Sequence, residues 1–502
     1  MKGVILAAGY ATRFLPASKT IPKEMFPLID RPVIDFIVQE MVDSGIEDIL
    51  LVSSRRKKVL EDYFDREVEL DSAFSKANSM EKLELIKPTS ANIFTLRQQE
   101  MMGTGNALML VEPFVQDAPF VVAYPDDIVM GDPPLTLQLI EAYKETGNTI
   151  LTVEALPEED ISRYGVIDPV NEGEIMGVRQ MVEKPAPGTE PSNYASYGRY
   201  LYTPEIFDAL RATDNTHEHQ GEFTQTEAIN QLALRGRVSA VKMKGTRYDV
   251  GEPLGYLLSS LQFGLRQDRF QKTLISEMDR EVELDSAFSK ANSMEKLELI
   301  KPTSANIFTL RQQEMMGTGN ALMLVEPFVQ DAPFVVAYPD DIVMGDPPLT
   351  LQLIEAYKET GNTILTVEAL PEEDISRYGV IDPVNEGEIM GVRQMVEKPA
   401  PGTEPSNYAS YGRYLYTPEI FDALRATDNT HEHQGEFTQT EAINQLALRG
   451  RVSAVKMKGT RYDVGEPLGY LLSSLQFGLR QDRFQKTLIS EMERILQQEN
   501  LK

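Results

Sequence analysis

Three cationic side chains follow the first apolar run of the chain within one short loop. The run at residues 3–8 ends at Gly9, and Arg13, Lys19 and Lys23 come shortly afterwards. Small residues let backbone N–H groups approach phosphates, and the cations can neutralise phosphate charge. This loop therefore suits a nucleoside triphosphate, although a glycine-containing loop alone is equally compatible with an ordinary surface loop.

Two aspartates far apart in the sequence each end an apolar, strand-like run. A fold that brings Asp126 and Asp249 together would offer carboxylate oxygens, the ligands that Mg²⁺ prefers. A single aspartate after a strand is more often a turn or helix cap. We expect Asp127 to be such a cap or to support the ligands, and the pair Asp126 and Asp249 to bind the ion.

The elements that must position these residues alternate between strand-like runs and helical patterns. A helix is expected at residues 32–44, with Pro32 in its first turn and Gly45 at its end. Strands are expected at residues 3–8, 49–53, 93–98, 120–124, 149–154 and 238–244. This alternation predicts an α/β fold, with a Rossmann-like, mixed but mostly parallel sheet covered by helices. Ligands then bind at the carboxyl ends of the strands.

An internal repeat decides the domain organisation. Residues 65–278 recur without a mismatch as residues 279–492, an offset of 214 residues. This is not a solenoid, because stacked repeats have periods of about 20 to 50 residues and diverge from one another. We expect a complete domain over residues 1–278, a second copy over 279–492 without the N-terminal nucleotide-binding segment, and a tail helix over 493–502.

Residues 1–64 are present once, so the chain has the parts for one complete site. Joining them to the second copy would loop out 214 residues, which costs about 5 kcal/mol. Burial of Ile495 and Leu496 in the tail could offset this cost, but a short terminal helix rarely buries such residues fully. We expect the first copy to form the site and the second to expose sheet edges.

The loop from Gly9 to Met25 resembles the signature of bacterial UTP:glucose-1-phosphate uridylyltransferases almost residue for residue. Later segments agree with that family in order and spacing. They are residues 97–98, 103–107, 124–127, 164–166, 182–185, 198–200, 221–223 and 243–251. The resemblance covers residues 1–278 and implies a sheet of the sugar nucleotidyltransferase type. It also implies transfer of a uridylyl group from UTP to glucose 1-phosphate, giving UDP-glucose and pyrophosphate.

The resemblance further implies which residues act. It assigns the catalytic cations Arg13, Lys23 and Lys184 to the phosphates. It implies that the nucleotide is bound by Ala8, Gly9, Gln98 and Gly105, and the sugar by Gly165 and Glu183. The two carboxylates of Asp126 and Asp249 would bind Mg²⁺. A lone glutamine or a Glu-Lys pair is usually solvated surface, so those assignments depend on the family.

The chain departs from the family pattern at several positions, and these leave alternatives open. Ala11 stands where glycine is usual, Met102 where lysine is frequent, Asn106 where histidine is frequent, Glu252 where asparagine is frequent, and Thr224-Gln225 where Gln-Leu is usual. One alternative is another sugar-1-phosphate nucleotidyltransferase that uses dTTP or a different hexose phosphate. The other is a non-catalytic paralogue that binds a sugar nucleotide.

Composition limits the partners and the compartment. The chain has 77 acidic and 49 basic residues, and its formal charge of -28 repels nucleic acid and anionic membranes. It has no cysteine for a disulfide framework or a thiolate nucleophile. No stretch approaches the roughly 20 apolar residues of a membrane span, and the first apolar run is too short for a signal peptide. We expect a cytoplasmic homo-oligomer that binds UTP and glucose 1-phosphate, but neither nucleic acid nor membranes.

Overall fold

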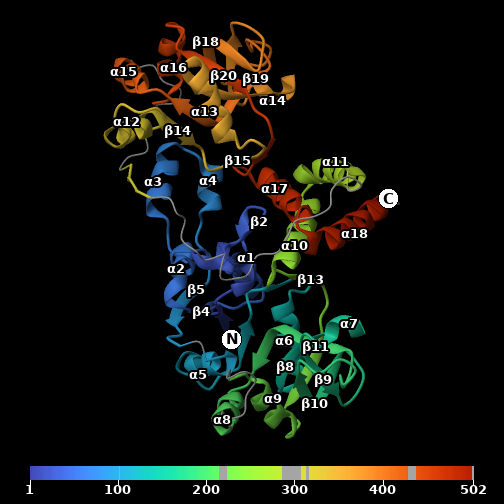
Figure 1. Ribbon diagram of the computed structural model, residues 1–502. Coiled ribbons are helices and arrows are strands. Elements are labelled where there is room, and N and C mark those ends of the chain that lie inside the picture. The colour runs from blue at the N-terminus through green and yellow to red at the C-terminus, as the bar shows by residue number, and fades with distance from the viewer. Residues whose placement is uncertain (101, 214–222, 285–306, 313–315, 428–436, 500–502) are drawn as a thin grey trace. The chain divides into compact units, whose positions relative to one another are not determined.

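The computed structural model describes residues 1–100, 102–213, 223–284, 307–312, 316–427 and 437–499 (Figure 1). The chain divides into two compact units. Unit 1 comprises Met1–Lys301 together with Phe477–Lys502, and unit 2 comprises Pro302–Gln476. The last helix of the chain therefore belongs to unit 1, although most of its sequence lies within the second copy of the repeat.

Unit 1 is built on a nine-stranded sheet with the order β5-β4-β1-β6-β11-β8-β12-β10-β9. Its strands are β1 (Lys2–Leu6), β4 (Asp48–Ser53), β5 (Asn92–Arg97), β6 (Phe120–Ala123), β8 (Thr149–Ala155), β9 (Gly165–Pro169), β10 (Ile175–Glu183), β11 (Tyr194–Tyr202) and β12 (Val238–Lys242). Neighbours within β5-β4-β1-β6 and β8-β12 are parallel. Strands β9, β10 and β11 pair antiparallel with their neighbours. The predicted mixed α/β sheet is confirmed.

Helices pack on the sheet through alternating side chains of its strands. The helices are α1 (Val33–Asp43), α5 (Thr104–Val115), α6 (Leu135–Thr146), α8 (Glu205–Ala212) and α9 (Thr226–Ala233). Val4 and Leu6 belong to the core cluster that α5, α8 and α9 complete. Ile5 points to the opposite face and is also fully buried. Figure 1 shows α6 over β8 and β11, and α6 also packs against α1. Burial on both faces explains why β1 is apolar from Gly3 to Leu6.

The remaining elements of unit 1 are short or lie outside this sheet. The single turns are η1 (Thr12–Phe14), η2 (Ala17–Lys19), η3 (Lys23–Met25) and η4 (Arg55–Lys57). The short strands are β2 (Pro27–Leu28), β3 (Arg31–Pro32), β7 (Asp127–Met130) and β13 (Thr246–Asp249). The helices are α2 (Lys58–Phe64), α3 (Val68–Lys76), α4 (Met80–Leu85), α7 (Glu158–Ile161), α10 (Pro253–Leu265), α11 (Asp268–Leu284) and α18 (Asp482–Glu499). Within the described ranges, none of the helices has the length and apolarity needed to cross a membrane.

The C-terminal helix α18 completes unit 1. It packs against α10 and α11, and Gln262 Nε2 donates to Glu491 Oε1 at 3.2 Å. Ile495 and Leu496 are only 7% and 8% exposed. The expectation that a short terminal helix would not bury these residues fully is wrong. They lie on the last turns of an 18-residue helix rather than on a short separate one, so the whole helix supports their burial.

Unit 2 has a smaller sheet because residues 1–64 have no second copy. Its order is β14-β19-β16-β20-β18-β17. The strands are β14 (Phe334–Ala337), β16 (Thr363–Ala369), β17 (Gly379–Pro383), β18 (Ile389–Glu397), β19 (Tyr408–Tyr416) and β20 (Val452–Lys456), and β15 (Asp341–Met344) pairs with β21 (Thr460–Asp463). The helices are α12 (Thr318–Val329), α13 (Leu349–Thr360), α14 (Glu372–Ile375), α15 (Glu419–Ala426) and α16 (Thr440–Ala447), and α17 (Pro467–Leu479) crosses into unit 1.

The first strand of the unit 2 sheet lies at an edge. In unit 1 its counterpart β6 lies between β1 and β11, and Val121 and Val122 are fully buried. Val335 and Val336 of β14 are only half-buried. The predicted exposure of a sheet edge in the second copy is confirmed.

The same difference leaves one arginine without its partner. Arg199 of β11 is 0% exposed, and its Nη2 and Nε donate to Glu40 of α1 at 2.5 and 3.1 Å. Glu40 also accepts hydrogen bonds from the backbone N and the hydroxyl of Thr136. Glu40 has no counterpart in the second copy. Accordingly, Nε of Arg413, the counterpart of Arg199, is buried without a hydrogen-bond partner among the described residues.

This pair of arginines gives a stability prediction. We expect Arg199→Met to destabilise unit 1 by about 3 to 5 kcal/mol, because it leaves the Glu40 carboxylate buried without its cation. Arg413→Met should be neutral or stabilising, since it removes an unsatisfied donor from unit 2. The urea concentration at which turnover is half lost, each variant normalised to its own activity without urea, measures unit 1. Equal shifts in both variants would contradict the assignment.

Candidate active site

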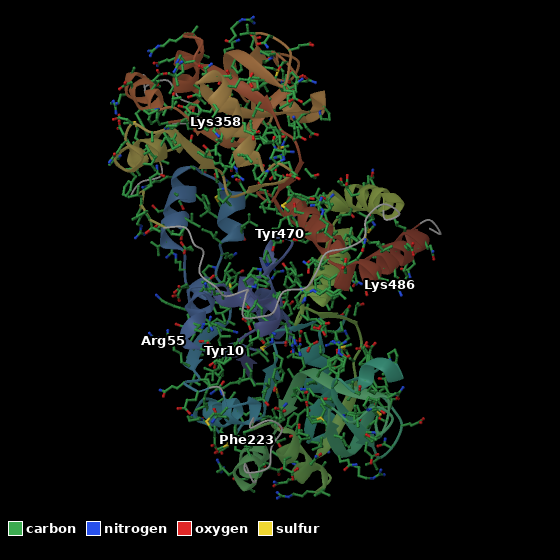
Figure 2. All side chains as sticks on the ribbon, in the orientation of Figure 1. Tyr10, Arg55, Phe223, Lys358, Tyr470 and Lys486 are labelled. Atoms are coloured by element: carbon green, nitrogen blue, oxygen red, sulfur yellow. The ribbon has the colours of Figure 1, made fainter. Side chains whose placement is uncertain are left out.

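A cavity of about 560 Å³ opens at the carboxyl ends of β1 and β6. Ten predicted residues line it: Ala8, Gly9, Arg13, Lys23, Gln98, Asp126, Gly165, Glu183, Lys184 and Asp249. Gly105 does not line the cavity; its backbone N donates to Phe223 O at 2.8 Å. Tyr10, at the cavity, and Phe223 are both labelled in Figure 2. The fold thus gathers predicted residues from distant segments around one space.

A buried ion pair fixes the loop that follows β1. Lys57 Nζ donates to Glu24 Oε1 at 2.8 Å and to the backbone O of Ala7 at 2.5 Å. Burial lowers the pKa of Lys57, while the Glu24 carboxylate opposes that shift. Ala11 adopts a left-handed conformation with a φ of 54°, which favours glycine at this position. The departure from glycine at this position therefore affects the backbone conformation of the loop. Arg13, in the turn that follows, is exposed.

Lys23 and Asp126 form an ion pair within the cavity. Lys23 Nζ donates to Asp126 Oδ2 at 2.6 Å. Burial opposes the charge of both groups, but each stabilises the other, so the pKa of Lys23 is raised and that of Asp126 is lowered. Both groups are therefore charged at neutral pH, and a cation stands next to the acidic end of the cavity.

The fold brings Asp126 and Asp249 together at this end. Asp126 follows β6, while Asp249 ends β13, which pairs antiparallel with β7. A Cβ placed on Gly251 would lie 3.0 Å from Asp126 Oδ2 and 3.2 Å from Asp249 Oδ1, so both carboxylates flank the same glycine. The backbone N of Gly251 donates to Asp249 Oδ1 at 2.9 Å. A side chain at residue 251 would therefore push against both carboxylates.

Asp127 and Arg247 form ion pairs next to the carboxylates of Asp126 and Asp249. Arg247 Nε lies 2.5 Å from Asp127 Oδ1, and its Nη2 lies 3.2 Å from Asp249 Oδ2. Burial raises the pKa of Asp127 to about 7; Arg247 opposes this shift, and Asp126 and Asp249 add to it. The Arg247 guanidinium also stacks 3.8 Å from the ring centroid of Tyr197. These contacts hold Asp249 in place.

The opposite end of the cavity presents an amide. Gln98 follows β5 and is only 5% exposed. Its Nε2 donates to Asn106 Oδ1 at 3.0 Å and to the backbone O of Gly103 at 3.4 Å. Gly103 has a φ of 95°, and a Cβ there would lie 2.3 Å from Phe223 O. Gln98 is therefore an oriented amide at the cavity wall rather than solvated surface.

The ends of β9 and β10 place a carboxylate and a cation side by side. Gly165 pairs with Glu183 in register, and a Cβ on Gly165 would lie 3.2 Å from Glu183 Oε2. Thr226 Oγ1 donates to the same oxygen at 3.4 Å. Lys184 follows with a φ of 46°, and its side chain is 68% exposed. This backbone turn leaves the ammonium at the cavity rim, 3.9 Å from Glu183 Oε1.

Sequence reasoning did not identify two arginines that line the cavity, Arg163 and Arg247. Arg247 lies two residues before Asp249 on β13, so the period of a strand places both on one face and could have indicated it. Arg163 Nη2 lies 3.3 Å from Glu252 Oε1, which gives the unusual Glu252 an ion-pair partner. Gly221 and Glu222 of the predicted motif lie outside the described residues.

The sequence profile of the Nucleotidyl transferase family matches the chain twice, at residues 2–263 and at residues 264–477. The two matches together span most of the chain, and the second falls largely on the repeated segment. This chain belongs to the nucleotidyl transferase family.

Curated relatives match over about half of the chain and nearly all of their own length. The UTP--glucose-1-phosphate uridylyltransferase of Staphylococcus epidermidis is 42% identical over 285 residues, which is 55% of this chain and 98% of that protein. The protein of the same name from Bacillus subtilis is 42% identical over 281 residues, 55% of this chain and 96% of its own.

Solved structures also match over about half of this chain and nearly all of their own length. UDP-glucose pyrophosphorylase from Acinetobacter baumannii matches with a TM-score of 0.51 and 34% identity, covering 55% of this chain and 99% of that one. The UTP-bound enzyme from the same organism also matches with a TM-score of 0.51, at 35% identity, covering 55% of this chain and 98% of that one.

Proposed function

We propose that this chain is an enzyme that transfers a uridylyl group from UTP to glucose 1-phosphate, giving UDP-glucose and pyrophosphate. The observation that carries this proposal is the single cavity in which an oriented amide, phosphate-loop cations, two carboxylates and a further carboxylate-cation pair meet. The relatives named as UTP--glucose-1-phosphate uridylyltransferases support it, at 42% identity over a complete enzyme length.

The nucleotide occupies the β1 and β5 side of the cavity in this proposal. The uracil edge lies against the Gln98 amide, because an amide can both donate to and accept from that edge; Gly105, which lies outside the cavity lining, positions the start of α5 through its bond to Phe223. The triphosphate runs along Ala8 and Gly9, whose small side chains let the backbone approach it. Arg13 neutralises phosphate charge from the exposed side of the loop.

The carboxylate pair fits a magnesium ion that the nucleotide helps to hold. Asp126 and Asp249 flank Gly251 and offer hard oxygen ligands. No group of three or more acidic or histidine side chains able to hold a metal occurs among the described residues. Phosphate oxygens and water would therefore complete the coordination, as is usual for Mg²⁺. When bound, the ion supplies neutralisation of phosphate charge.

The sugar phosphate occupies the β9 and β10 side. Glu183 accepts hydrogen bonds from sugar hydroxyls, and the missing side chain of Gly165 lets its carboxylate lie close to the β9 backbone. Lys184 holds the sugar phosphate. One oxygen of that phosphate attacks the α-phosphorus of UTP in line, and the bond from this phosphorus to the bridging oxygen breaks, releasing pyrophosphate. The attacking oxygen is already ionised, so no general base is needed, and Lys23, Lys184 and Arg13 stabilise the transferring group.

A panel of substrates tests the proposal. We expect pyrophosphate release with UTP and glucose 1-phosphate to exceed the rate with dTTP, or with another hexose phosphate, by at least about tenfold, since a difference of roughly 1.4 kcal/mol in transition-state binding has this effect. Pyrophosphate release by the purified chain, measured for each nucleotide and sugar phosphate in turn, gives the comparison. A higher rate with dTTP would identify a different nucleotidyltransferase, and binding of UDP-glucose without turnover would identify a non-catalytic paralogue.

We place the transferase in residues 1–278, supported by the cavity in unit 1, with residues 493–502 as part of the tail. Cytoplasmic action accords with the acidic composition and the phosphorylated substrates. We also propose that the chain forms a homo-oligomer, and light scattering on the purified full chain measures its molar mass.

A further inference from the structure

Unit 2 keeps a second copy of the base and sugar sides of the site. Gln312, Glu397, Lys398 and Asp463 are the counterparts of Gln98, Glu183, Lys184 and Asp249. All four are among the described residues of unit 2; Gln312, Glu397 and Asp463 keep side-chain contacts of their counterparts, and Lys398 keeps the backbone conformation of Lys184.

The base side is preserved without the first strands of the sheet. Gln312 Nε2 donates to Asn320 Oδ1 at 2.8 Å and to the backbone O of Gly317 at 3.4 Å, compared with 3.0 and 3.4 Å in unit 1. The backbone N of Gly319 donates to Phe437 O at 2.8 Å, as Gly105 does to Phe223. The oriented amide therefore does not depend on β1 or β4.

The sugar side is preserved in the same way. Thr440 Oγ1 donates to Glu397 Oε2 at 3.1 Å, and a Cβ on Gly379 would lie 3.2 Å from that oxygen. Lys398 has a φ of 44°, close to the 46° of Lys184. The backbone thus turns in the same left-handed conformation after β18 as it does after β10.

Arg461, the counterpart of Arg247, also keeps the contacts of that residue. Arg461 pairs with Asp341 and lies 2.9 Å from Asp463 Oδ2, and its Nη1 donates to Tyr378 OH at 3.3 Å. The matching contacts of Arg247 in unit 1 are 3.2 and 3.3 Å. Sequence identity alone does not guarantee this, because unit 2 has lost the neighbours β1 and α1.

Unit 2 lacks the part of the site that handles the triphosphate. The loop after β1, with Arg13 and Lys23, has no second copy in the sequence. Without those cations a transferring phosphoryl group has no charge stabilisation from the loop, so transfer is not expected. In the proposed arrangement, the nucleobase and the hexose contact residues outside this loop.

We infer that unit 2 is a second, non-transferring site for a nucleoside diphosphate sugar. Gln312 meets the base edge, Glu397 accepts from hexose hydroxyls, and Lys398 provides one cation for the diphosphate. This inference rests on the proposed function of unit 1, whose matching residues hold the product UDP-glucose. Binding is weaker than in unit 1 by about tenfold or more, because the loss of even one charge-assisted hydrogen bond has this effect.

Equilibrium dialysis of the full chain with labelled UDP-glucose tests the inference. We expect two classes of site per chain, one tight and one weak. Glu397→Ala should remove the weak class, and Glu183→Ala should weaken the tight class. The double variant should lack the unit 2 class that Glu183→Ala retains and keep only the weakened class of unit 1. A matched control is Glu388→Ala, which alters an exposed carboxylate paired with Lys458 on the same unit and should change neither class.

Two outcomes would overturn the inference. One is a single class of site in the unchanged chain up to millimolar ligand; the other is a weak class that persists in Glu397→Ala with unchanged circular dichroism. Turnover measured on the same samples separates this result from the proposed function. If Glu183→Ala retains full turnover, the sugar assignment in unit 1 fails, whatever the binding data show for unit 2.

Discussion

Asp126→Asn is expected to lower kcat by about 10²- to 10³-fold, which is the usual effect of removing one group that stabilises charge in a transition state. Asp126 lies in the cavity of unit 1, paired with Lys23 at 2.6 Å and next to Asp249. The amide keeps the shape of the carboxylate but cannot carry its charge. Pyrophosphate release at saturating UTP and glucose 1-phosphate measures the change.

The duplication supplies a control for this variant within the same chain. Asp340 is the counterpart of Asp126, and the backbone N of Val464 donates to its O at 2.8 Å, much as Val250 does to Asp126 at 2.9 Å. The triphosphate loop has no second copy, so Asp340→Asn should leave kcat within about twofold of the unchanged chain. A large loss in Asp340→Asn with little change in Asp126→Asn would move the active site to the second copy.

Most of the strands that could be predicted from the sequence are buried on both faces, although β5, also predicted, is largely exposed. Runs such as residues 3–8 and 120–124 are apolar at every position, and they form β1 and β6. Strands β10 and β11 were not predicted as strands. Each carries a register shift, between Val178 and Gln180 in β10 and between Ser196 and Tyr200 in β11. A bulge adds a residue and breaks the period of two on which strand prediction depends.

Prediction of the site residues from the sequence followed motifs rather than geometry. The loop cations and the two aspartates were proposed from the chemistry of their segments, whereas Gln98, Glu183 and Lys184 were assigned because their segments resemble a family. Arg247 matched no assigned role, although it contacts both Asp127 and Asp249. Its importance depends on β13 pairing with β7, a contact between segments far apart in the chain. That pairing has no local signal in the sequence, although the spacing of two residues does place Arg247 and Asp249 on one face of a strand.

The repeat gives the chain two helices that begin with the same sequence. Residues 268–278 and 482–492 are identical, so no property of their sequence can decide which of the two helices belongs to which unit. The structure places both α11 and α18 in unit 1 and packs them against each other. Residues 493–499 differ from residues 279–285 and extend α18, and they bury Ile495 and Leu496. The unique tail therefore contributes to unit 1, the unit that contains the cavity.

Turnover is expected to fall to background in excess chelator and to return when Mg²⁺ is added. The cavity gathers Asp126 and Asp249 beside the place proposed for a triphosphate, and these like charges repel each other unless a cation lies between them. Lys23 and Arg247 already pair with the two carboxylates, and they offset only part of the charge that UTP would add. Pyrophosphate release before and after the addition of Mg²⁺ measures the effect.

The same geometry predicts how metal and nucleotide binding are coupled. Two carboxylates alone leave most ligand positions of an octahedral ion to water, so Mg²⁺ should bind weakly to the free chain and more tightly with UTP present. Linkage then requires UTP to bind more tightly in the presence of Mg²⁺, by the same factor. Titration of UTP with and without Mg²⁺ measures this factor, and Asp249→Asn should reduce it, whereas Asp463→Asn in unit 2 should not. Full turnover in excess chelator, or UTP affinity independent of Mg²⁺, would show that these carboxylates serve another purpose.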